Sequence, residues 1–115
     1  MEATLRAFHR IVKRHTDLKW ARSRDDLLSR TIKALRAFKE GRSLQEVLAN
    51  RELSFEIEDS LEELYSFAVN YGDETDRLIN LISLFIKSPA PCKIRLINFV
   101  EVLVEDRRVS EGKEV

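Results

Sequence analysis

The chain is poor in the side chains that most often carry catalytic or metal-binding chemistry. Its 115 residues include one cysteine, Cys92, and two histidines, His9 and His15. A lone cysteine excludes an internal disulfide and is typical of a reducing compartment. The usual signatures of zinc and calcium sites are missing, because there is no cysteine pair, no two histidines one helical turn apart and no loop of alternating Asp and Asn. We therefore expect no metal, no cofactor and no enzymatic activity.

These three residues have ordinary structural interpretations. His15 falls on the apolar side of a predicted helix, where a hydrogen-bonded core histidine is more common than a catalytic one, and His9 lies on the polar flank. Cys92 shares a predicted buried arc with Leu96 and Phe99, and small free cysteines usually pack as hydrophobic residues. We expect Cys92 to be buried.

Glycine, proline and long apolar runs are also scarce. Gly41, Gly72 and Gly112 are far apart, so the chain has no glycine-rich phosphate loop. The longest apolar stretch, 78–86, contains two polar residues and is shorter than the roughly 20 residues that span a bilayer. Arginine and lysine interrupt the first residues, which lack the apolar core of a signal peptide. We expect a cytoplasmic protein with no membrane partner.

What the chain does contain is apolar residues at helical spacing. They predict helices at 4–20, 25–39, 44–50, 55–71, 73–87 and from 92 to 108. Gly41 and Gly72 are expected to end helices, Ser43 to cap the short third one, and Asp73 or Thr75 to cap the fifth. The sequence therefore predicts an all-α protein, a compact bundle of five or six helices.

We expect a single domain over 1–108 and a flexible tail at 109–115, where the residues are mostly polar. The predicted core face of the last helix is Leu96, Phe99, Val100, Leu103 and Val104. The β-branched residues between positions 99 and 104 leave a strand as an alternative, although no pairing partner for it is evident.

Charge is segregated along the chain. Residues 1–50 carry twelve Lys or Arg against six acids, whereas 51–75 carry one Arg against eight acids. The net charge of zero therefore combines a basic first half with an acidic middle, an arrangement that favours association with charged partners.

The basic residues of the first two predicted helices are the candidate nucleic-acid contacts, because most of them lie away from the apolar faces. They are Arg6, Arg10, Lys13, Arg14, Lys19, Arg22, Arg24, Arg30, Lys33 and Arg36. We expect them to form one outward surface that binds a nucleic-acid backbone, RNA or single-stranded DNA, without base specificity. Trp20 could stack on an exposed base or cover the edge of the core. A solvated face without a ligand remains an alternative.

A helix-turn-helix can also be drawn over 43–61. Its second helix would present five acids to the DNA phosphates, namely Glu56, Glu58, Asp59, Glu62 and Glu63. Because like charges would oppose docking, we reject major-groove recognition by this segment.

Other residues are candidates for contacts with protein partners. Ile94 and Val102 point away from the predicted core face of the last helix, and the acidic segment could meet the basic surface of another copy, head to tail. The candidate partner interface is Trp20, Glu56, Asp59, Glu63, Ile94 and Val102.

In size, helicity and charge the chain resembles the small helical subunits of CRISPR effector complexes. The resemblance implies a non-enzymatic subunit of a nucleoprotein complex, with a role in antiviral defence and with other protein subunits as partners. Two alternatives stay open. One is an adaptor or regulator that self-associates or binds an acidic protein through 6–36. The other is an enzyme subunit completed by a second polypeptide.

Overall fold

The computed structural model describes residues 2–17, 24–54 and 57–113, with side chains at 2–14, 26–54 and 57–105. The described residues form seven α-helices and one 3-10 helix, and no strand occurs among them, so the predicted all-α fold is confirmed. The elements are α1 (Glu2–Asp17), α2 (Arg24–Lys39), α3 (Leu44–Ala49), α4 (Arg51–Ser54), η1 (Glu58–Ser60), α5 (Leu61–Asn70), α6 (Gly72–Lys87) and α7 (Ala90–Lys113). The strand considered for residues 99–104 is wrong, because α7 runs through them.

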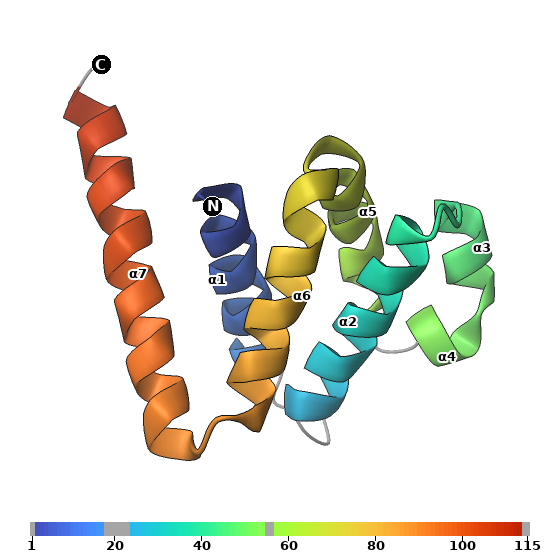
Figure 1. Cartoon of the computed structure of the whole chain (residues 1–115), viewed down its shortest axis with the longest axis horizontal. Helices are drawn as coiled ribbons and strands as arrows, with labels where there is room; N and C mark the ends of the chain where they lie inside the picture. Colours follow the sequence, from blue (N-terminus) through green and yellow to red (C-terminus); the bar gives the residue numbers. More distant parts are fainter. Residues whose placement is uncertain (1, 18–23, 55–56, 114–115) are drawn as a thin grey trace.

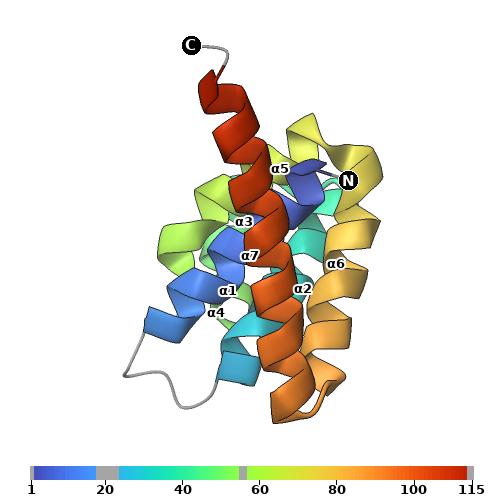
Figure 2. The ribbon, with the colours of Figure 1, turned by 90° about the vertical axis from the view of Figure 1, so that its left-hand side faces the viewer.

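Helix α6 lies at the centre of the bundle and contacts α1, α2, α5 and α7 (Figure 1). The short helices α3 and α4 lie at one side of the molecule and α7 at the other (Figure 1). Seen from that side, α7 crosses in front of α1, with α6 next to it, and projects past α1 at its C-terminal end (Figure 2). One apolar cluster fills the space between the helices, with Phe8, Leu35, Leu61 and Ile82 almost completely buried. The rings of Phe8 and Phe85 pack edge to face, with their centroids 5.7 Å apart.

Local signals set the turn after α2 as predicted. Gly41 has a φ of 94°, the left-handed conformation that glycine adopts without a steric penalty. The Gly41 and Arg42 amides donate to the carbonyls of Phe38 and Ala37, over 3.0 and 3.1 Å, which satisfies the end of α2. Ser43 then caps α3, since its hydroxyl accepts a hydrogen bond of 3.2 Å from the amide of Glu46.

The helix predicted over 55–71 begins later. Ser54 ends α4 and is buried, with its hydroxyl 3.1 Å from the carbonyl of Asn50, to which it donates. A 3-10 turn over Glu58–Ser60 follows, and the α-helix starts only at Leu61. Ile57 and Leu61 are nevertheless both buried. The buried positions therefore agree with the predicted apolar spacing, whereas the predicted start of the α-helix is wrong.

The junction of α5 and α6 is also tighter than predicted. Gly72 does not lie in a turn; it is the first residue of α6, and Tyr71 is the cap that the two helices share. The predicted capping by Asp73 or Thr75 is wrong, because no side chain caps α6 and the buried Thr75 donates its hydroxyl back to the carbonyl of Tyr71 over 3.3 Å.

Helix α7 differs from its prediction in where it ends and in which side chains it buries. It extends to Lys113, beyond the predicted end at Arg108. Phe99 was assigned to the core, yet 63% of its surface is exposed, and Cys92 is exposed as well. Val100 and Val104 are buried and Ile97 packs against the core instead, because α7 rests on α1 along this narrower face.

Candidate functional site

The basic residues of α1 meet the acidic segment inside the same molecule. Arg10 Nε lies 3.3 Å from Glu63 Oε1, and Arg14 Nη2 lies 2.9 Å from Glu63 Oε2. Arg14 also donates through Nη1 to the hydroxyl of Ser60, over 2.9 Å. The acids of the middle segment therefore offset part of the basic surface of α1, and Glu63, assigned to a partner interface, is engaged within the chain.

Two further members of the predicted basic surface have intramolecular partners. Arg6 pairs with Glu2 on the preceding turn of α1, with 2.8 Å between Nη2 and Oε1. Arg30 donates from Nη1 to the carbonyl oxygen of Glu52, over 2.8 Å, and so ties α2 to α4. The expected single surface of free cations therefore does not hold for Arg6, Arg10, Arg14 and Arg30, each of which has a partner within the chain.

Several of the predicted site residues, or their side chains, fall in the parts of the chain that the structure does not describe. Lys19, Trp20, Arg22 and Glu56 lie outside the described residues, as does the side chain of Arg24. Asp59, Ile94 and Val102 are exposed, as expected of residues available to a partner.

The remaining cations of α2 lie in a groove. It runs between α2 and α6, has a volume of about 360 Å³, and is lined by Ser29, Ile32, Lys33, Arg36, Ser83, Ile86 and Lys87. The α2 members follow the spacing of one helix face, and the α6 members do the same on a helix that packs against α2. Lys33 and Arg36 are among the site residues predicted from the sequence, whereas Lys87, which lies 51 positions beyond Arg36 in the chain, is not.

The electrostatics of this groove are one-sided. Among the residues that the structure describes, three cations and two hydroxyl groups line it, and no acidic residue does. Lys33, Arg36 and Lys87 are exposed, and within the described part of the chain none of the three forms an ion pair. Farther along the same two helices the charge is balanced, because Lys39 pairs with Asp76.

The chemistry of the groove suits an anionic oxygen ligand. A guanidinium group binds two oxygens of one phosphate or carboxylate, ammonium groups supply point charges, and serine hydroxyls donate further hydrogen bonds. Ile32 and Ile86 contribute aliphatic surface without hydrogen-bonding groups. The described lining of the groove contains no aromatic side chain on which a base could stack.

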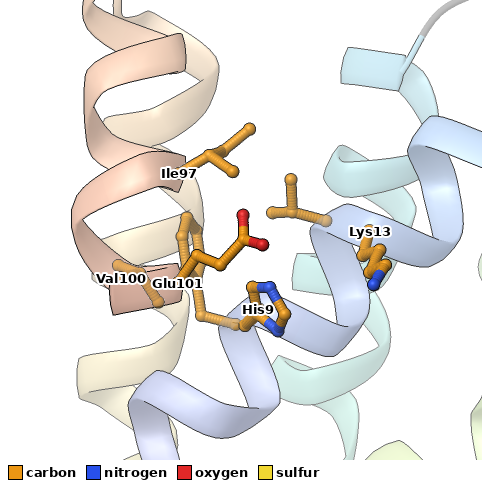
Figure 3. A pocket seen from close by; sticks show the side chains of 7 residues that line it. His9, Lys13, Ile97, Val100 and Glu101 are labelled. Carbon is orange, nitrogen blue, oxygen red and sulfur yellow. The ribbon is translucent and has the colours of Figure 1, made fainter. Parts of the chain in front are cut away.

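A second hollow lies between α1 and α7. Its volume is about 180 Å³, and its lining is mostly apolar, with Phe8, Val12, Ile97 and Val100. The polar side chains at its border are His9, Lys13 and Glu101, and those of His9 and Glu101 point toward each other (Figure 3).

The adjoining surface carries both signs of charge. A hollow of about 410 Å³ there is lined by His9, Arg10, Lys13, Arg14, Glu101, Val104 and Glu105. Because two carboxylates of α7 face the cations of α1, this side attracts a polyanion less than the groove between α2 and α6 does.

Within the described residues, no group of three or more His, Cys, Asp or Glu side chains is placed to hold a metal ion. None of the described helices is both long enough and apolar enough to cross a membrane. Comparison of the chain with protein-family models, curated protein sequences and solved structures finds no match.

Proposed function

We propose that this protein is a non-enzymatic subunit that binds the phosphate backbone of a nucleic acid, RNA or single-stranded DNA, in the groove between α2 and α6. The observation that carries the proposal is that Lys33, Arg36 and Lys87 surround a concave surface with two serine hydroxyls and, among its described lining residues, no acid. The cations predicted on α1 support it less, because Glu63 and the acids of α7 face them.

The groove favours one flexible strand over a duplex. Two packed helices border it, so a single backbone can lie along the depression with its phosphates toward the cations and its bases toward solvent. Contacts of this kind give affinity without reading the sequence. The protein would therefore bind unrelated single strands about equally well.

Salt dependence gives a quantitative test. For single strands the logarithm of affinity falls with the logarithm of salt by about 0.7 per phosphate contact, so three contacts predict a slope of roughly −2. A fourfold rise in salt should then weaken binding by about twentyfold. Fluorescence anisotropy with labelled 20-nucleotide RNA and DNA measures this slope directly.

Charge reversal locates the site. We expect Lys33→Glu and Arg36→Glu each to reduce affinity by about tenfold and to lower the salt slope. Lys13→Glu is the matched control, because it changes the net charge equally at an exposed lysine that lies beside Glu101. Equal losses from all three variants, or no salt-sensitive binding by folded protein, would contradict the proposal.

A protein adaptor is the second candidate function. It is favoured by the exposed apolar side chains of α7, since Phe99 and Val102 are 63% and 56% exposed. In that case the groove would bind an acidic segment of a partner protein. Binding of poly-glutamate with higher affinity than a nucleic acid of equal charge would support the adaptor.

A further inference from the structure

Helix α7 leaves three large apolar side chains exposed. It is the longest of the described helices, with 24 residues, and its main contacts are with α1 and, to a smaller extent, α6. Ile94, Phe99 and Val102 are all more than half exposed, and they are three of the six large hydrophobic residues exposed among the described side chains. Phe99 and Val102 are three residues apart and so are neighbours on one side of the helix, and adjoining exposed apolar side chains are candidates for an interaction site.

The exposed residues of α7 also carry an ordered charge pattern. Arg95, Phe99, Val102 and Glu105 are exposed and follow one another at intervals of three or four residues, so they lie along the same side of the helix. The stripe is therefore basic at one end, apolar in the middle and acidic at the other end. Within the described part of the chain, neither Arg95 nor Glu105 forms an ion pair. Glu105 lies at the edge of the stripe, because it also lines the hollow that α7 shares with Arg10 and Arg14 of α1.

This pattern is self-complementary when one of two copies is reversed. We propose that α7 pairs with α7 of a second copy in an antiparallel arrangement, with the two-fold axis passing between Phe99 and Val102. Phe99 then packs on Val102 of the second copy, and Arg95 faces Glu105 of the second copy. One two-fold axis accommodates both contacts, because the midpoint between positions 99 and 102 and the midpoint between positions 95 and 105 are only half a residue apart along the helix.

The charges of Arg95 and Glu105 favour an antiparallel over a parallel pairing of α7, and a second copy over another partner. A parallel pair would bring arginine against arginine and glutamate against glutamate, which is unfavourable. In the antiparallel pair the two-fold axis repeats the contact between Arg95 and Glu105, so the dimer contains two attractive contacts, as in an isologous dimer. Because the stripe carries a positive charge at one end and a negative charge at the other, it fits a second copy of itself better than a partner of one charge sign. Because one pair of helices buries little area, the dimer should be weak and concentration-dependent.

Charge exchange tests this arrangement. By sedimentation velocity over a wide concentration range, the wild-type protein should convert from monomer to dimer. Arg95→Glu and Glu105→Arg should each weaken dimerisation by about tenfold or more, since every substitution acts twice in a symmetric dimer. The double variant Arg95→Glu/Glu105→Arg should recover the wild-type affinity, and so should a mixture of the two single variants.

An apolar pair of variants provides the matched control. Val102→Asp should abolish the dimer, whereas Val69→Asp, at a similarly exposed valine of α5, should leave it unchanged. Circular dichroism on each variant would confirm that the fold is retained.

The single cysteine reports the direction of pairing. In the antiparallel dimer the two Cys92 positions lie about 17 residues apart along the helix pair, or roughly 25 Å at 1.5 Å per residue. Spin labels on the exposed Cys92 should therefore report a distance above about 25 Å, and mild oxidation should not cross-link the dimer.

Three results would overturn the proposal. They are a monomer at all concentrations, charge variants that dimerise like the wild type, and Cys92 pairs that cross-link readily. None of these outcomes depends on nucleic-acid binding, so the dimer and the proposed function can fail separately.

Discussion

Replacing Glu63 with glutamine removes the carboxylate that pairs with Arg10 and Arg14 and leaves the shape of the side chain nearly unchanged. Both ion pairs are partly exposed, since the arginine side chains are 60% and 44% exposed and that of Glu63 is 33% exposed. Pairs of this kind contribute about 0–1 kcal/mol each. We expect the free energy of unfolding to fall by about 1 kcal/mol, equivalent to about 4 °C in the melting temperature of a domain of this size.

Urea denaturation followed by circular dichroism measures this change, and the effect should shrink in high salt. The control is Glu62→Gln, because Glu62 is an exposed neighbour on the same helix. A loss above about 3 kcal/mol would mean that Glu63 acts as a buried charge, contrary to its exposure.

The same variant separates two locations for nucleic-acid binding. Glu63→Gln frees two arginines of α1 but leaves the groove between α2 and α6 untouched. Affinity for a single strand should rise by no more than about twofold, the effect of one added positive charge at a distance. A tenfold gain would place the binding surface on α1 and refute the assignment to the groove.

Two pairs of substitutions test the fold. Gly41→Ala should cost about 1 kcal/mol although nothing lies within 4 Å of the added carbon, because the φ of 94° disfavours a side chain, whereas Gly72→Ala, at the start of α6, should be neutral or slightly stabilising. Thermal melts of the two variants should therefore move differently. Phe8→Ala should destabilise by about 3–5 kcal/mol because Phe8 is 1% exposed, whereas Phe99→Ala should change monomer stability by less than about 0.5 kcal/mol. Similar losses at Phe8 and Phe99 in urea titrations would contradict the packing of α7.

Much of the helical architecture could be predicted from the sequence. The turn at Gly41 and the cap at Ser43 depend on residues within one helical turn, and both are as predicted. The start of α5 was misplaced because an apolar period of three to four residues is compatible with both a 3-10 turn and an α-helix over so short a segment. The burial of Phe99 was predicted wrongly because the apolar residues between Ile94 and Val104 lie on several sides of α7, and docking decides which side meets α1.

Only the α2 side of the groove between α2 and α6 could be predicted from the sequence. Lys33 and Arg36 are separated by three residues on α2, and helical spacing alone places them together. Lys87 joins them only because α6 packs against α2, and no local pattern marks a lysine in the last turn of α6 as their neighbour.

By itself the sequence determined that the chain is helical, where several of its turns lie, and that its basic and acidic residues are segregated along its length. Only the tertiary structure decided which of those charges remain free. Arg14 and Ser60 are 46 positions apart, and their contact depends on how α1 and the segment leading into α5 dock. Helix formation is governed by interactions over a few residues, whereas the pairing of charges is governed by which helix faces meet. The same docking that offsets arginines of α1 leaves Lys33, Arg36 and Lys87 around a groove whose described lining contains no acid.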